Sequence, residues 1–225
     1  MTNDARIDEP EGSILTALDR MTADAPEAGL SLSQIFDALD ERAFGALLFI
    51  LAIPCCVPFL YGVPQIVSLP MTAIAIQMVM GRHEPWLPEK FARRMVNRQG
   101  LERISKGGRK YFGWAETIAR PRLTFLSSPA AERIVGVLLV LFCCSILVPL
   151  PATNTVPGFA VALIAFGLMA RDGLMMIVGI VVGTLWIAML LSVVFLFGAT
   201  IFTGAEGTGD VIRPLLDWFG SIGRS

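Results

Sequence analysis

The chain has 225 residues, of which 54% are hydrophobic and 16% charged, and its mean hydropathy is +0.65. About 25% of the residues of an average soluble domain are charged, so this composition excludes an ordinary soluble domain and predicts an all-α integral membrane protein. The net charge of −1 hides two opposed segments: residues 1–42 carry three basic and ten acidic side chains, and residues 82–133 carry twelve basic and five acidic ones.

The first segment, residues 1–30, is acidic and begins without an apolar core, so it is not expected to be a signal peptide. We expect it to be largely disordered, with a short helix near Ser13 to Met21. Ser31 and Gln34 have the spacing of a capping box, which predicts that a helix begins there. Its apolar face leads into the first uncharged run.

Two uncharged runs, residues 43–81 and 134–170, follow the same pattern. Each begins after a Glu-Arg pair and contains two prolines six residues apart. The prolines are Pro58 and Pro64 in the first run and Pro151 and Pro157 in the second. We interpret residues 31–81 and 132–172 as two internal repeats, which set the architecture.

Proline cannot continue a helix because it lacks an amide hydrogen, so each repeat is predicted to be a helical hairpin with a broken turn. We expect the turns over residues 54–64 and 149–157. The last arm, residues 158–170, would be about 20 Å long, shorter than a hydrocarbon core of roughly 30 Å. Either the hairpins are re-entrant and their turns meet inside the membrane, or they are ordinary hairpins with turns in the outer interface.

The segment between the repeats, residues 82–131, is basic and amphipathic. Helices are predicted over residues 88–99, closed by Gly100, and over residues 109–120. Basic helices with aromatic faces lie on anionic membrane surfaces, and we prefer this interpretation to nucleic-acid binding. Basic segments beside membrane spans stay in the cytoplasm, so residues 82–133 are predicted to be cytoplasmic.

Residues 173–203 form one long apolar segment that predicts a transmembrane helix. Gly179 and Gly183 have the small-xxx-small spacing that lets two helices approach closely, which favours a homodimer. Residues 204–225 are predicted to be an amphipathic, interfacial C-terminus.

Enzymatic chemistry is not indicated. His83 is the single histidine, and no arrangement of nucleophile, base and orienting group is apparent. No phosphate-binding glycine loop occurs. The adjacent pairs Cys55-Cys56 and Cys143-Cys144 lack the spacing of zinc ligands; they are interpreted as packing residues, with a redox-sensitive contact between the repeats as the alternative. We therefore predict a protein that is not an enzyme and has neither cofactor nor metal.

The remaining polar groups gather near the proline turns. Pro64 and Pro157 occupy the place where a returning helix begins, so the amides and the positive dipole end of that helix face the turn. Such a place suits an anion or carbonyl and hydroxyl oxygens. Thr153 and Asn154 either line such a site or cap helices. The candidate substrate-binding residues are Pro58, Pro64, Gln65, Gln77, Pro151, Thr153, Asn154, Pro157, Arg171 and Asp172.

Several short motifs are characteristic of one known family. They include the entry at residues 41–45, Pro85-Trp86-Leu87-Pro88, Arg120-Pro121-Arg122-Leu123 and Arg171-Asp172-Gly173. In these motifs the chain resembles the exopolysaccharide-synthesis ExoD family of bacterial membrane proteins, over roughly residues 30–190. The resemblance implies a multi-pass protein of the bacterial inner (plasma) membrane, connected with exopolysaccharide production and, in some members, with tolerance of alkaline conditions.

We expect a small transporter or permease that works as a homodimer in the lipid bilayer. Its path would be lined by the two proline turns and would carry ions or small anionic solutes. The alternative is a non-transporting accessory or scaffold protein that organises exopolysaccharide synthesis through its basic linker. No nucleic-acid partner is expected.

Overall fold

A computed structural model of the chain describes residues 14–26, 29–40, 42–58, 60, 62–118, 128–148, 154–203 and 213. The chain divides into two compact units, Met1–Gly183 and Thr184–Ser225. Apart from one pair of two-residue strands, the regular elements in the described ranges are helical. They are α1 (Ile14–Asp24), β1 (Leu30–Ser31), α2 (Leu32–Leu39), α3 (Arg42–Cys56), α4 (Val63–Val79), α5 (Glu89–Ala92), β2 (Met95–Val96), α6 (Arg98–Ile118), α7 (Pro129–Leu147), α8 (Thr155–Ala170) and α9 (Gly173–Thr203).

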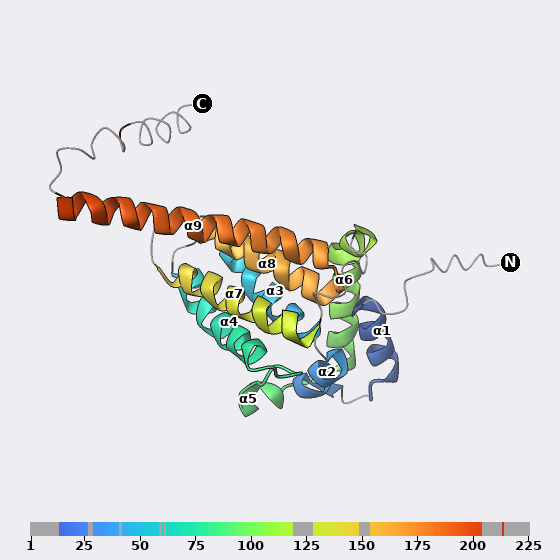
Figure 1. Cartoon of the computed structure of the whole chain (residues 1–225). Coiled ribbons are helices and arrows are strands. Elements are labelled where there is room, and N and C mark those ends of the chain that lie inside the picture. Colours follow the sequence, from blue (N-terminus) through green and yellow to red (C-terminus); the bar gives the residue numbers. More distant parts are fainter. Residues whose placement is uncertain are drawn as a thin grey trace. The chain divides into compact units, whose positions relative to one another are not determined.

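Four helices from the two uncharged runs form a bundle (Figure 1). Helix α3 packs mainly against α8, and α4 packs mainly against α7. Contacts between α3 and α4 and between α7 and α8 complete the ring. Helices α4 and α8 therefore occupy opposite corners of the bundle.

Close approaches between backbones give the direction of the paired helices. A Cβ atom added to Gly45, near the start of α3, would lie 2.7 Å from the carbonyl oxygen of Ala165 in α8. A Cβ atom added to Gly158, near the start of α8, would lie 2.8 Å from the Cβ of Cys55 in α3. Helices α3 and α8 are therefore antiparallel, and they approach closely because glycine has no side chain.

The second pair of helices is arranged in the same way. A Cβ atom added to Gly136, near the start of α7, would lie 3.0 Å from the amide nitrogen of Val79, the last residue of α4. Helices α4 and α8 therefore begin at the same end of the bundle. We call this end, where Cys55, Pro64 and Asn154 lie, the turn end.

The prolines interrupt the helices less than predicted. Pro54 lies inside α3, which continues to Cys56, so the predicted break after residue 53 is wrong. In the last turn of a helix a proline removes only one main-chain hydrogen bond. Helix α8 begins at Thr155, before Pro157, and has 16 residues rather than the predicted 13. Pro157 is tolerated there because amides of the first turn have no partner inside the helix.

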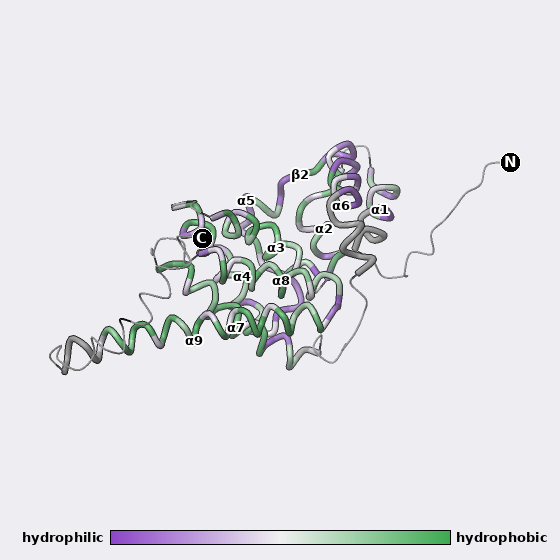
Figure 2. The backbone as a smooth tube through the Cα atoms, turned by 90° about the horizontal axis from the view of Figure 1, so that it is seen from above, coloured by the Kyte–Doolittle hydropathy of each residue, from purple (hydrophilic) through white to green (hydrophobic). Residues whose placement is uncertain are grey.

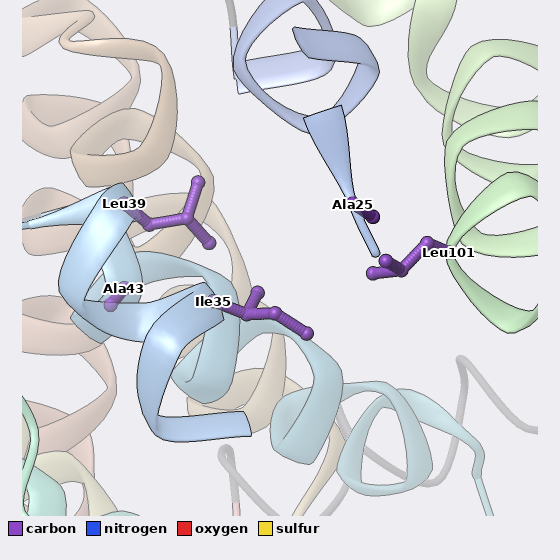
Figure 3. Close-up of a cluster of buried hydrophobic side chains, with 5 residues drawn as sticks. All are labelled: Ala25, Ile35, Leu39, Ala43 and Leu101. Carbon is purple, nitrogen blue, oxygen red and sulfur yellow. The ribbon is translucent and has the colours of Figure 1, made fainter. Parts of the chain in front are cut away.

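A smaller region, the cap, consists of residues 14–40 and 82–118 and is attached to the bundle at the start of α3. Its buried apolar cluster contains Ala25, Ile35, Leu39 and Leu101 together with Ala43 of α3 (Figure 3). Met169 of α8 packs against the same cluster. The cap is therefore continuous with the bundle core, at the end opposite the turn end.

The predicted capping box at the start of α2 is confirmed. The backbone amide of Gln34 donates to Oγ of Ser31, and the amide of Ser31 donates to Oε1 of Gln34 at 2.9 Å. Directly before this helix, Leu30 pairs with Val96 in the antiparallel β1–β2 pair. A two-residue strand is too short to produce a period in the sequence, so this pairing was not predicted.

The predicted helices of the basic linker have the wrong bounds. Helix α5 covers only Glu89–Ala92, and α6 runs from Arg98 to Ile118. The side-chain oxygen of Asn97 accepts from the amide of Gly100 at 2.8 Å. Asn97 therefore caps the start of a helix, and Gly100 lies in its first turn instead of ending a preceding helix.

Helices α1 and α6 are joined by a partly exposed polar contact in the cap. The carboxylate of Asp19 accepts hydrogen bonds from Ser105 and Arg109. Burial alone would raise the pKa of Asp19, but these hydrogen bonds and the charge of Arg109 together lower it. Ser105 is only 5% exposed.

The outer faces of the bundle helices are apolar as well as their inner faces. Figure 2 shows hydrophobic residues along α4, α7 and α9, and hydrophilic residues along α6. Large apolar side chains that point outward include Ile50, Ile66, Leu69, Ile134 and Phe159. A helix that is apolar all round belongs in a hydrophobic surrounding. Residues 130–147 and 173–198 are long and apolar enough to span a bilayer, which indicates a membrane protein.

The glycines of α9 pack inside the chain. A Cβ atom on Gly179 would lie 2.8 Å from the carbonyl oxygen of Ala160 in α8. One on Gly183 would meet the ring of Phe142 in α7. The assignment of this glycine face to a dimer contact is therefore wrong, and the homodimer stays a prediction without that support. The predicted C-terminal amphipathic segment lies outside the described residues except for Arg213.

Candidate functional site

Two buried prolines open the return helices at the turn end. Pro64 lies in the first turn of α4, after Gly62, whose φ of 82° is in the left-handed region. Pro157 lies in the first turn of α8 and is also buried. Pro58 is exposed. Pro151 and Thr153 lie outside the described residues.

Asn154 is a buried polar residue whose side-chain oxygen accepts no hydrogen bond. It occupies the N-cap position of α8, but its side chain makes no capping hydrogen bond. The residue is 8% exposed, and its Oδ1 atom is shielded and accepts no hydrogen bond. The capping interpretation therefore does not hold for the Asn154 side chain. A buried acceptor that is left unpaired costs about 1 to 3 kcal/mol, so this group needs an explanation.

Gln65 repeats this feature in the other hairpin. It follows Pro64 in the first turn of α4, and its Oε1 atom is shielded and unpaired. Asn154 and Gln65 thus place two unsatisfied amide oxygens at the same end of the bundle. Both lie there because α4 and α8 begin at the turn end.

The hydroxyl groups near the turn end donate to their own helices. Ser68 is fully buried and donates to the carbonyl oxygen of Gln65 at 2.8 Å. Ser145, 9% exposed, donates to the carbonyl oxygen of Phe142 at 2.7 Å. Their hydroxyl oxygens keep lone pairs that can accept. Ser145 was missed from the sequence because nothing in its neighbourhood distinguishes it from an ordinary helix residue.

Three candidate residues lie at the opposite end of the bundle. The carboxamide of Gln77 exchanges hydrogen bonds with the main-chain carbonyl and amide of Trp86. Arg171 is exposed and ends α8 in the left-handed conformation, with φ 53°. Asp172 is 1% exposed, and its Oδ1 accepts from the amide of Leu174 at 2.9 Å. Gln77 and Asp172 thus form hydrogen bonds with nearby main-chain groups at the end of the bundle that adjoins the cap.

The thiols of the turn end are unbridged. Cys55 and Cys143 are buried, while Cys56 is half-buried and Cys144 exposed, and all four are free. Cys55 lies against Gly158 of the other hairpin. The small thiol at this position allows α3 and α8 to approach closely.

The cap contains an open pocket of about 440 Å³ between α2 and the segment after α4. Its lining residues are Ser33, Phe36, Asp37, Arg82, His83, Glu84, Pro85, Trp86, Leu87 and Ala92. A hydrogen bond that protonated Glu84 donates to Asp37, together with the negative charge of Asp37, raises the pKa of Glu84. The two carboxyl groups are therefore close enough to share a proton.

Together these features define an all-helical membrane protein with a polar cap and buried, unpaired amide oxygens at the far end of its bundle. The chain belongs to the family described as "Exopolysaccharide synthesis, ExoD", whose profile matches residues 14–192. This agrees with the resemblance read from the sequence motifs.

Two curated relatives support the same placement. An uncharacterized protein of Synechocystis sp., slr1875, is 28% identical over 193 residues, which cover 84% of this chain and 87% of the relative. The protein ExoD of Rhizobium meliloti is 27% identical over 172 residues, which cover 74% of this chain and 71% of the relative. No solved structure is significantly similar to the chain.

Proposed function

We propose that the protein is a small inner-membrane permease that serves exopolysaccharide production, with its path passing through the turn end of the bundle. The observation that carries this proposal is the buried, unpaired oxygen of Asn154. A membrane interior has no bulk water to satisfy such a group. A buried polar group without a partner lowers the stability of a membrane protein, so its presence indicates a place that a solute or water occupies.

The lengths of the helices support a turn end inside the membrane. Helix α3 has 15 residues and α7 has 19, which corresponds to about 22 and 28 Å. A hydrocarbon core is roughly 30 Å thick. If the cap lies at one membrane surface, α3 and α7 are therefore too short to reach beyond the other surface, and the starts of α4 and α8 lie inside the core. In this proposal the basic linker, residues 82–133, is cytoplasmic, the protein is multi-pass, and the two hairpins are repeats with the same orientation.

The pairing of the helices supports such a repeat. Gly45 of α3 approaches the end of α8, and Gly136 of α7 approaches the end of α4. Each of these glycines follows the arginine of a Glu-Arg pair by three residues in the sequence. A two-fold axis along the bundle would bring the two proline turns to one end, as a shared path requires.

The experiment is a flux measurement on purified protein in liposomes, with protons, sodium, potassium and chloride as test solutes. Wild-type protein should pass at least one of them faster than protein-free vesicles. Asn154→Leu should abolish this flux while the protein remains folded, because it removes the polar group and keeps the bulk. Asn97→Leu is the matched control: it removes the cap of α6 and should leave flux per folded molecule unchanged. Wild-type flux in Asn154→Leu would remove the turn end from the path.

A second candidate is the non-transporting accessory protein. It is favoured by the exposed apolar side chains Trp86, Phe91 and Met95 of the cap, which are 60%, 54% and 57% exposed. They lie in sequence beside the basic residues Lys90, Arg93, Arg94 and Arg98. If this surface carries the function, Phe91→Ser should lower the exopolysaccharide yield of cells and Asn154→Leu should not.

A further inference from the structure

We infer that residues 86–98 of the cap lie on the headgroup layer of the membrane and select anionic phospholipids there. This segment, which we call the docking segment, runs from Trp86 through α5 and β2 to Arg98, the first residue of α6. The inference goes beyond the proposed function and does not depend on it, because a permease and an accessory protein are equally compatible with such a contact.

Hydrogen bonds fix the start of the docking segment beside the end of α4. Gln77 lies in the last turn of α4. Its carboxamide accepts from the main-chain amide of Trp86 and donates to the carbonyl oxygen of Trp86 at 3.3 Å. Ile76 of α4 and Met80, its C-cap residue, are exposed and apolar. The apolar outer face of α4, which a lipid tail covers, therefore extends to the level of Trp86.

The docking segment continues this apolar surface. Trp86, Phe91 and Met95 are large apolar side chains, and each is more than half exposed. Tryptophan and phenylalanine beside basic residues are typical of the boundary between acyl chains and headgroups. Because the lipid that surrounds α4 reaches the same level, it is the occupant that can cover these three side chains without a further partner.

Three basic side chains of the docking segment are available for lipid phosphates. The segment has four basic residues and one acidic residue. Arg93 pairs with the acidic residue, Glu89, at 3.2 Å. Lys90, Arg94 and Arg98 are exposed and form no ion pair within the described ranges. Their charge is complementary to the negative surface of a leaflet that contains anionic lipids.

The longer helix of the linker turns its apolar face to the cap instead. Leu101 of α6 is buried in the apolar cluster of the cap, and Ser105 donates to Asp19 of α1. In the described part of α6, Ile104 is the large apolar side chain that stays exposed. The membrane-surface role that the sequence predicts for the whole linker therefore belongs mainly to residues 86–98.

The test measures which lipid lies beside Phe91 in the full-length chain reconstituted in nanodiscs. In a protein without its native cysteines, Phe91→Cys carries a fluorescent probe, and the discs contain phosphatidylglycerol and phosphatidylcholine in equal amounts. A nitroxide quencher is attached to the upper acyl chain of one lipid or of the other, so that the two preparations differ in nothing else.

Each basic residue near an anionic surface contributes roughly fivefold to binding. Labelled phosphatidylglycerol should therefore quench the Phe91→Cys probe severalfold more strongly than labelled phosphatidylcholine. Ala23→Cys is the matched control, because Ala23 is exposed on α1, which packs mainly against α6. Its probe should be quenched weakly, and equally by the two lipids.

Two changes should abolish the selection. The combined variant Lys90→Gln, Arg94→Gln and Arg98→Gln should be quenched equally by both lipids but as strongly overall, because the apolar side chains still contact the membrane. Salt at about 1 M, which screens charges beyond roughly 3 Å, should have the same effect on the protein with its basic residues intact, so the test does not rely on the folding of the variant.

The remaining outcomes contradict the inference. Equal quenching by the two lipids at low salt, with the basic residues intact, would overturn the selection of anionic lipid. A Phe91→Cys probe that is quenched no more than the Ala23→Cys probe would overturn the lipid contact itself, and would assign the exposed side chains to a protein partner.

Discussion

Gly158 of α8 lies against Cys55 of α3, so that a Cβ atom at Gly158 would stand 2.8 Å from the Cβ of Cys55 and 2.9 Å from its carbonyl carbon. This contact joins the two hairpins directly at the turn end. Real Cβ atoms do not approach backbone this closely, so the position requires glycine. The start of α8, with Asn154, is held in place by this contact.

We predict that Gly158→Ala destabilises the protein. The new methyl group would overlap the backbone of Cys55, and overpacking of this kind costs about 1 to 3 kcal/mol. Thermal unfolding in detergent should show a lower midpoint. Gly198→Ala is the control, since a Cβ atom there meets nothing within 4 Å. Equal midpoints for the two variants would mean that α3 and α8 are not packed as described.

Gly183→Leu should weaken the fold rather than a dimer. A Cβ atom at Gly183 would lie 2.3 Å from the ring of Phe142, so the branched side chain must push α9 away from α7. We expect a lower unfolding midpoint than in Gly198→Leu, measured together with the oligomeric state by light scattering. An unfolding midpoint equal to that of the wild type, together with loss of a dimer, would show instead that Gly183 lies in a contact between two chains.

Glu84→Gln should change how stability depends on pH. Asp37 raises the pKa of Glu84 above its ordinary value of 4.5, Asp40 adds to the shift, and His83 opposes it. A carboxyl group whose pKa is raised in the folded state stabilises the fold below its unfolded pKa of 4.5. This stabilisation is lost as the pH rises through the pKa of the folded state. The variant should therefore be more stable than the wild type at pH 7 and equal to it at about pH 4. Parallel curves of unfolding midpoint against pH would contradict the carboxyl pair.

The side of the cap can be determined by thiol labelling. A cysteine at Arg103, which is exposed, suits this better than one at Ser105, which is buried and bonded to Asp19. In a protein without its native cysteines, Arg103→Cys should resist an impermeant reagent added to intact spheroplasts and react in inverted vesicles. Rapid reaction in intact spheroplasts would place the cap outside.

Local signals in the sequence predicted much of the helical content. The uncharged sequence contains α4, α8 and α9 and most of α3 and α7, and the Ser31–Gln34 capping box marks the start of α2. Helix ends were less predictable, because a proline in the first or last turn costs little. Pro54 and Pro157 both lie inside helices for this reason.

The candidate site was only partly predictable. The sequence drew attention to Gln65 and Asn154 because they adjoin the proline turns. It could not show that their oxygens are unpaired, since hydrogen-bond satisfaction depends on residues brought near by folding. For the same reason it could not separate Gln65 from Gln77, which are equally polar in the sequence but differ in partners and lie at opposite ends of α4.

That pair provides the most direct test of the account, because Gln65→Leu and Gln77→Leu make the same change at the two ends of one helix. Gln65→Leu removes an unpaired acceptor and should leave the unfolding midpoint equal or higher, while ion flux in liposomes is lost. Gln77→Leu breaks two hydrogen bonds to Trp86 and should lower the midpoint, while flux per folded molecule is kept. If flux in both variants simply follows the folded fraction, the turn end is not a functional site and the account is contradicted.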